Sequence, residues 1–310
     1  MPNLRRALAV SALAVAAAAQ DSTPEFSSNV RVVTLLATVR NKSTGAIVKD
    51  LAQRDFRLEE DGHSQKIRYF SRESELPLVL GMLVDTSQSM RPMFEPVRLA
   101  SNRFFKQVLR EDRDVAAIVH FDVATGILQD FTSSRDRLAA ALEQLQIPPR
   151  RFVGTVLYGA IRDASQNLMK DRSGRKAFIL LSDGVSFRDE TSIETAIEYA
   201  QRADTLIYTV LYSTFRRGGR GFTVAIGPRP NRGPKVMERL ARETGGAYFA
   251  VSRGGSIDAI YAQIEDDLRS QYSIGYTPDR SATDGRYRRL KLTVTRPGLV
   301  VRTRDGYYPR

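Results

Sequence analysis

The sequence predicts an α/β protein with a doubly wound, mostly parallel sheet flanked by helices, together with a small β-sandwich-like module. Three observations lead to this prediction. Between residues 76 and 270, apolar runs typical of buried strands alternate with stretches of helical period. The flanking segments, 21–75 and 271–310, show the period-two alternation of antiparallel strands. Polar residues directly follow two of the apolar runs, at the sheet edge where open α/β proteins bind ligands.

The N-terminal flank contains the first expected strands. Residues 30–39 read as one strand, because Val33, Leu35, Ala37 and Val39 occupy alternate positions. Residues 56–58 and 66–69 lie on either side of an Asp-Gly dipeptide at 61–62, which is typical of a hairpin turn. This flank is therefore expected to be all-β.

The central strand is expected within residues 78–90, LVLGMLVDTSQSM. Its first half is a continuous apolar run after Pro77, which is typical of a parallel strand buried on both faces. The run delivers Asp85, Ser87 and Ser89 at its carboxyl end. A polar loop at that end is the first indication of a binding site.

The rest of the central region continues the alternation. Pro148 and Pro149 stop one expected helix, and Gly245-Gly246 ends another. Helices are expected over 94–109, 135–145, 157–168, 193–200, 237–241 and 257–268, and strands over 114–121, 126–131, 177–183, 206–211 and 248–251. The short strand 126–131 is a candidate for a sheet edge.

The C-terminal flank returns to short strands. Residues 272–276 and 290–294 alternate, and Pro297-Gly298 turns the chain into 299–301 and a terminal segment 305–308. Small antiparallel pieces need three or more strands or a covering surface to be stable. We therefore expect the two flanks to pair into one module, with the α/β domain of residues 76–270 inserted between them.

Oxygen-bearing side chains gather at the predicted carboxyl edge of the sheet. Asp85, Ser87 and Ser89 are joined there by Thr155, which opens a helix, and by Asp183, which ends an apolar run. Oxygen-only ligation suits Mg²⁺, Mn²⁺ or Ca²⁺ rather than zinc. The alternative interpretation makes Asp85 and Ser87 a helix cap and residues 182–184 a turn.

In these residues the chain resembles the von Willebrand factor type A family, whose metal-ion-dependent adhesion site is DxSxS followed by a Thr and then an Asp. All five positions are filled in the family's order. The resemblance implies that Ser87, Ser89 and Thr155 bind the metal directly, while Asp85 and Asp183 act mostly through water. It also implies that a Glu or Asp of a protein partner completes the coordination. The flanks resemble those of a bacterial subgroup of the family.

The resemblance predicts a binding module that works in adhesion or assembly and is not an enzyme. A structural envelope module, whose metal only stabilises the fold, stays open as an alternative. A Mg²⁺-dependent phosphotransfer enzyme is less favoured, because the haloacid dehalogenase pattern needs a second Asp where Ser87 stands. There is no G-x-S-x-G elbow or P-loop, and His63 and His120 both fall on predicted β structure.

A basic segment leaves the same predicted edge of the sheet. Residues 213–234 contain no acidic residue and carry five arginines, which are Arg216, Arg217, Arg220, Arg229 and Arg232. We expect this segment to contact an acidic partner, the alternative being a solvated Gly/Pro-rich loop. The formal net charge of +12 also favours acidic proteins or envelope polyanions. Nucleic acid is not expected, because no helix-turn-helix, RNP or zinc-finger signature is present.

The first twenty residues have the layout of a secretory signal peptide. Arg5 and Arg6 precede an Ala-rich run over 7–19 that is too short to span a membrane. We expect cleavage near residue 20 and a secreted or periplasmic bacterial protein, with an uncleaved anchor as the alternative. The sequence has no cysteine, and no transmembrane segment is expected in the mature chain.

Overall fold

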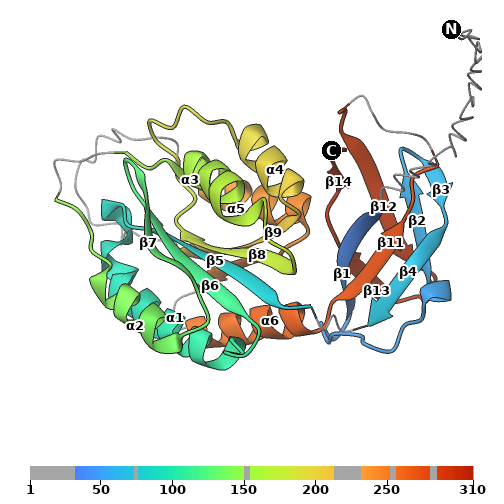
Figure 1. Ribbon diagram of the computed structural model, residues 1–310, viewed down its shortest axis with the longest axis horizontal. Coiled ribbons are helices and arrows are strands. Elements are labelled where there is room, and N and C mark those ends of the chain that lie inside the picture. The colour runs from blue at the N-terminus through green and yellow to red at the C-terminus, as the bar shows by residue number, and fades with distance from the viewer. Residues whose placement is uncertain are drawn as a thin grey trace, which may run out of the picture. The chain divides into compact units, whose positions relative to one another are not determined.

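The computed structural model describes residues 32–72, 76–149, 154–212, 232–251, 256–279 and 285–309. They form an α/β domain and a β-module (Figure 1). Within these ranges, the helices are all too short or too polar to cross a membrane. The predicted fold class is confirmed.

The α/β domain is built on a six-stranded sheet with the order β10-β9-β8-β5-β6-β7. All neighbouring strands are parallel except the antiparallel pair β6 and β7. The bounds are β5 (Leu78–Asp85), β6 (Val115–Phe121), β7 (Thr125–Thr132), β8 (Arg175–Ser182), β9 (Thr205–Tyr212) and β10 (Tyr248–Val251). The strand order reverses at β5, so its carboxyl end is the topological switch point where such sheets bind ligands. As expected, β7 is an edge strand.

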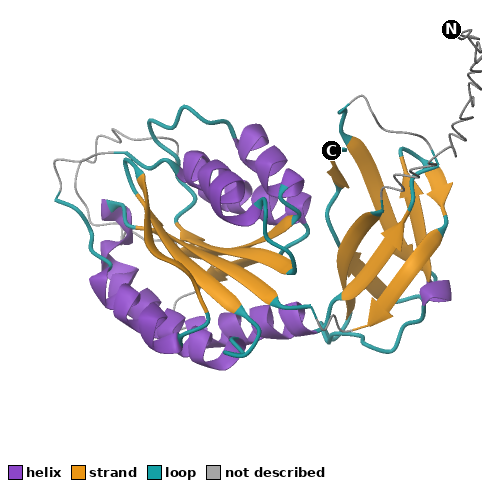
Figure 2. Ribbon diagram, viewed as in Figure 1, coloured by secondary structure: helices purple, strands orange, loops and turns teal. Residues whose placement is uncertain are grey.

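Helices cover both faces of this sheet (Figures 1 and 2). Leu80, Met82 and Val84 of β5 pack into one core, whereas Val79 and Leu83 pack into the other, because successive strand residues point to opposite faces. The first core is closed by α1 (Phe94–Val108), α2 (Arg135–Gln144) and α6 (Ile257–Arg269). The second is closed by α3 (Leu157–Ala164), α4 (Ile193–Arg202) and α5 (Gly233–Thr244). This two-sided burial explains the unbroken apolar run of β5.

The β-module consists of two four-stranded antiparallel sheets around one core. Their orders are β13-β1-β11-β4 and β14-β12-β2-β3. The bounds are β1 (Val33–Asn41), β2 (Phe56–Glu60), β3 (His63–Gln65), β4 (Ile67–Arg72), β11 (Tyr272–Tyr276), β12 (Arg288–Val294), β13 (Leu299–Arg302) and β14 (Gly306–Tyr307). Both flanks contribute to each sheet, since β1 pairs with β11 and β13, and β2 pairs with β12.

The α/β domain is inserted between β4 and β11, which are themselves paired. Arg72 and Tyr272 are register partners in that antiparallel pair. The chain therefore leaves the β-module and returns to it at one point of one sheet. The boundaries at 75/76 and 270/271 remain predictions; they fall between β4 and β5 and between α6 and β11.

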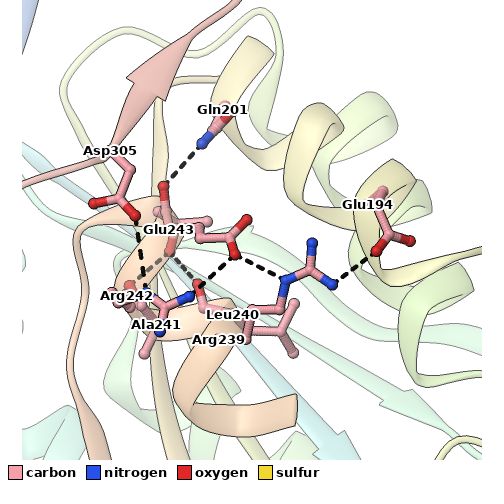
Figure 3. A network of polar contacts seen from close by, with 9 residues as sticks. Glu194, Gln201, Arg239, Leu240, Ala241, Arg242, Glu243 and Asp305 are labelled. Atoms are coloured by element: carbon pink, nitrogen blue, oxygen red, sulfur yellow. Dashed lines mark hydrogen bonds and ion pairs between the residues drawn. The ribbon is translucent and has the colours of Figure 1, made fainter. Parts of the chain in front are cut away.

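A polar network fixes α5 against α4 (Figure 3). Arg239 donates to Glu194 of α4 at 2.7 Å and to Glu243 of its own helix at 2.8 Å. Gln201 of α4 donates to the carbonyl oxygen of Glu243 at 2.8 Å. These contacts hold the C-terminal half of α5 against α4.

The structure differs from the sequence prediction in details. Among the described residues the first strand runs over Val33–Asn41, two residues beyond the expected end, and residues 30 and 31 lie outside them. The hairpin expected between 56–58 and 66–69 is wrong, because β2 pairs through the Asp-Gly turn with β3, while β4 belongs to the other sheet. The helix expected over 157–168 is α-helical to Ala164 and continues as a wider π turn over Ser165–Met169. A strand of three residues and a single π turn are too short for the apolar periodicity to distinguish.

Candidate metal centre

Asp85 ends the central strand and is fully buried. Its Oδ1 accepts a hydrogen bond from the backbone N–H of Ser87 at 2.8 Å, and its Oδ2 accepts one from the Ser182 hydroxyl at 2.6 Å. The first bond turns the chain sharply after the strand. The second connects Asp85 to the end of the neighbouring strand β8, so the carboxylate is held from two sides.

Ser87 and Ser89 lie side by side in that turn. Their Oγ atoms are 3.0 Å apart. Ser87 is nearly buried and Ser89 is exposed. Adjacent ligands of an octahedral Mg²⁺ ion with metal–oxygen distances near 2.1 Å lie about 3 Å apart. The spacing of the two hydroxyls therefore fits two neighbouring coordination positions.

Thr155 is fixed by a backbone bridge to the loop between β8 and α4. Its N–H donates to the carbonyl oxygen of Phe187 at 2.9 Å, and the N–H of Phe187 donates back at 3.0 Å. The next residue, Val156, donates its N–H to the carbonyl oxygen of Asp122 at the end of β6, at 2.7 Å. Thr155 is thus clamped between two loops at the carboxyl edge of the sheet.

Asp183 follows β8 in a tight turn. Its Oδ1 accepts from the N–H of Val185 at 3.0 Å, and the N–H of Gly184 donates to the Ser182 hydroxyl at 3.0 Å. The start of α5 lies against this turn, because a Cβ built on Gly233 would lie 2.2 Å from the carbonyl oxygen of Asp183. Glycine at 233 therefore permits the close approach.

Asp85 is an acidic residue with a raised pKa. Burial and then the negative charge of Asp183 raise its pKa to about 7, against the opposing hydrogen bonds from Ser182 and Ser87. A divalent cation beside the two carboxylates would stabilise both in their ionised form. The donor set, two carboxylates and hydroxyls with no nitrogen or sulfur, fits Mg²⁺, Mn²⁺ or Ca²⁺.

Two aspartates that the sequence analysis did not identify form hydrogen bonds with the loops of the candidate site. Asp189 Oδ2 accepts from the N–H groups of Tyr158 and Gly159 at 2.7 and 3.2 Å, and from the Ser186 hydroxyl at 2.9 Å. Asp122 Oδ2 accepts from the Thr86 hydroxyl at 3.2 Å. Each of them accepts a hydrogen bond from a residue more than thirty positions away, Tyr158 for Asp189 and Thr86 for Asp122, which no local sequence signal indicates. In the part of the chain that the structure describes, three or more His, Cys, Asp or Glu residues nowhere cluster as metal ligands.

Only the end of the predicted basic segment lies within the described residues. Arg216, Arg217, Arg220 and Arg229 lie outside the described residues. Arg232 is described and exposed, and it directly precedes Gly233 beside Asp183. The segment therefore re-enters the described structure next to the candidate site.

Comparison with protein families gives one match. The von Willebrand factor type A domain matches residues 80–263, which include all five candidate metal residues. A comparison with curated proteins gives no match.

Several solved structures are similar to this chain at low sequence identity. Proximal thread matrix protein 1 from the mussel byssus, described with a zinc-occupied MIDAS motif, is 13% identical with a TM-score of 0.51, over 67% of this chain and 49% of that protein. BatB from Bacteroides thetaiotaomicron is 18% identical with a TM-score of 0.47, over 62% and 97%. The vWF domain of the type V pilus tip protein Mfa5 from Porphyromonas gingivalis is 15% identical with a TM-score of 0.48, over 62% and 95%.

The family match extends over more than half of the chain, and the fold described above agrees with it. The chain belongs to the von Willebrand factor type A domain family.

Proposed function

We propose that this chain is a secreted, divalent-metal-dependent protein-binding module. Ser87, Ser89 and Thr155 would hold Mg²⁺ directly, with Asp85 and Asp183 anchoring its water ligands. A carboxylate from a protein partner would take the open position. The bound ion supplies the positive charge that attracts this carboxylate.

The observation that carries the proposal is the pair of serine hydroxyls 3.0 Å apart beside a buried Asp85. Uncharged hydroxyl ligands leave most of the ion's charge uncompensated, which favours an anionic partner group. The chain holds Asp85 in place through Ser87 N–H and the Ser182 hydroxyl, so the carboxylate is oriented before an ion arrives. The mussel protein's zinc-occupied motif supports metal binding in this family, although the oxygen-only donor set here favours Mg²⁺, with Mn²⁺ or Ca²⁺ as alternatives.

The proposal also includes the cellular location of the protein and the role of its basic segment. An N-terminal signal peptide cleaved near residue 20 would deliver the protein to the periplasm or outside the cell. The basic segment with Arg216, Arg217, Arg220, Arg229 and Arg232 would then add attraction for an acidic partner or for envelope polyanions. The net charge of +12 supports this part of the proposal.

The test is thermal unfolding of the chain from residue 21 in chelator and then in millimolar Mg²⁺, Mn²⁺ or Ca²⁺, followed by calorimetric titration of each ion. An ion that binds only the folded state raises the unfolding temperature. We expect this rise in the wild type and its loss in Asp183→Ala. Asp112→Ala is the matched control, because Asp112 is exposed and lies before β6, at the opposite edge of the sheet.

If neither unfolding nor calorimetry detects an ion in the wild type, the metal-dependent proposal is wrong. A structural envelope module, whose metal only stabilises the fold, is a different outcome, in which an ion is detected. Asp85→Ala would then lower stability in the presence of the ion, but capture of an identified protein partner would survive the substitution.

A further inference from the structure

We propose that the partner segment carries an apolar side chain within two residues of its metal-binding carboxylate, and that Phe187 and Val123 form the surface that receives it. This inference rests on the proposed function and adds a chemical description of the partner. The pair of side chains is called the apolar rim below.

The first argument is the position of Phe187 relative to Thr155. The two residues exchange both backbone hydrogen bonds of an antiparallel bridge, at 2.9 and 3.0 Å. In such a pair both side chains project from the same face, with Cβ atoms roughly 5 Å apart. The Phe187 side chain therefore stands on the same face of the bridge as the side chain of Thr155, the proposed metal ligand.

Val123 lies beside the same short loop. A Cβ built on Gly154, the residue before Thr155, would lie 2.9 Å from Cγ1 of Val123 and 3.6 Å from the carbonyl oxygen of Phe187. Val123 and Phe187 thus border one backbone segment that ends in a proposed metal ligand. Both positions are fixed by the loops that build the site.

Both side chains are exposed although they are large and apolar. Phe187 is 39% exposed and Val123 is 42% exposed. Other large apolar residues of the α/β domain fill its two cores, and the exposed ones among them are Leu76 before β5, Leu99 on α1 and Ile127 on β7. Single exposed apolar residues are ordinary, but two that flank a proposed ligand suit a contact with a partner.

The residue after Phe187, Arg188, supports a role of the apolar rim in partner binding. Arg188 has a φ of 58°, which is uncommon for a residue with a side chain, and its guanidinium lies 5.4 Å from the centre of the Phe187 ring. The arginine lies over the Phe187 ring and adds positive charge to the apolar rim. No described carboxylate forms an ion pair with Arg188. Charge and apolar surface together fit an acidic residue with an apolar neighbour.

A partner segment suits this rim better than a second copy of the chain. The ion requires a carboxylate, whereas this chain carries a net charge of +12 and would repel itself. Two side chains also offer room for about one apolar side chain, so we commit to a short acidic segment of a different protein.

The experiment uses phage-displayed peptides with a fixed Glu and random neighbours, selected on the chain from residue 21 in millimolar Mg²⁺ and eluted with chelator. We expect Leu, Ile, Phe or Met to be enriched at one position within two residues of the Glu. A selected peptide should bind Phe187→Ala about tenfold more weakly, because partial burial of one apolar side chain contributes about that factor. Phe187→Leu should restore most of the affinity, and Leu99→Ala, an exposed apolar residue on α1, should change nothing.

Replacing the apolar residue of the peptide by Ser tests the same contact without altering the protein. This measurement remains valid even if Phe187→Ala does not fold properly. The Ser peptide should bind wild type and Phe187→Ala equally. Selected Glu peptides without an apolar neighbour, or unchanged binding to Phe187→Ala, would overturn the inference and leave the proposed function standing. Absence of any chelator-sensitive Glu peptide would overturn both. Self-association in Mg²⁺ that Phe187→Ala abolishes would assign the rim to a second copy and also overturn the inference.

Discussion

Ser182 donates its hydroxyl hydrogen to Asp85 at 2.6 Å while its oxygen accepts the N–H of Gly184 at 3.0 Å. This one hydroxyl joins the ends of the neighbouring strands β5 and β8. It also shapes the turn that carries Asp183. Ser182 is therefore the link between the two acidic residues of the candidate site, although it is not among the five motif positions.

We expect Ser182→Ala to weaken Mg²⁺ binding by about ten- to a hundredfold, as found when a group that orients a metal ligand is removed. The reason is that Asp85 Oδ2 loses its donor and is free to reorient. Titration calorimetry measures the change. Ser165→Ala is the matched control, since the buried Ser165 hydroxyl has no hydrogen-bond partner among the described residues. Equal affinity of Ser182→Ala and wild type would contradict the linking role.

Gly233→Ala should lower both stability and metal affinity. An added Cβ would meet the carbonyl oxygen of Asp183 at 2.2 Å, so either α5 or the Asp183 turn must move. Overpacking of this kind typically costs about 1–3 kcal/mol. Denaturant unfolding and calorimetric titration test the two effects. Lys235→Ala, an exposed change in the same helical turn, should affect neither, and a Gly233→Ala protein with normal stability would show that the helix start adapts freely.

Asp189→Ala should loosen the Thr155 loop. The carboxylate accepts from the N–H groups of Tyr158 and Gly159 at the start of α3, and leaving such donors unpaired costs roughly 1–3 kcal/mol. We expect lower thermal stability and weaker metal binding. Asp189→Asn retains one acceptor oxygen and should lose less. If both variants behave alike, the carboxylate contributes through its charge rather than through these bonds.

The loss of folding stability at acid pH should depend on Asp114. This carboxyl group is fully buried, and burial raises its pKa. Hydrogen bonds from Leu78 N–H at 2.8 Å, Arg110 N–H at 3.0 Å and Arg269 lower the pKa by more, so it lies below that of a free aspartate. Because the folded pKa is depressed, the stabilisation is complete above the unfolded value and is lost as pH falls through the folded one.

Asp114→Asn therefore removes stability at neutral pH, and its deficit should shrink as pH falls below about 4. Denaturant unfolding of both proteins at a series of pH values measures this. Asp136→Asn, at the solvent-facing start of α2, is the control with no such dependence. A deficit that stays constant from neutral to acid pH would show that Asp114 acts through geometry alone.

Much of the fold could be predicted because its signals are local. The apolar run of β5 reflects cores on both sheet faces, and the alternation of Leu35, Ala37 and Val39 reflects one buried face. Ser134 and Ser192, which accept N–H bonds at the starts of α2 and α4, are local signals of the same kind. The pairing of the two flanks followed from the instability of short isolated sheets.

The supporting residues of the candidate site could not be predicted, because their partners are distant in sequence. Ser182 reaches Asp85 across 97 positions, and Asp189 reaches Tyr158 across 31. The bridge of Thr155 to Phe187 joins loops that follow different strands. The DxSxS pattern identifies candidate ligands, whereas the geometry that positions them arises only from the assembled sheet.

The register of Arg72 with Tyr272 has a mechanical consequence. Since the α/β domain enters and leaves through adjacent ends of β4 and β11, tension applied to that domain by a bound partner pulls both strands in the same direction. The two strands therefore carry the load together instead of being pulled apart from each other. Because β4 is an edge strand, this load passes to the rest of the sheet through the pair of β11 with β1.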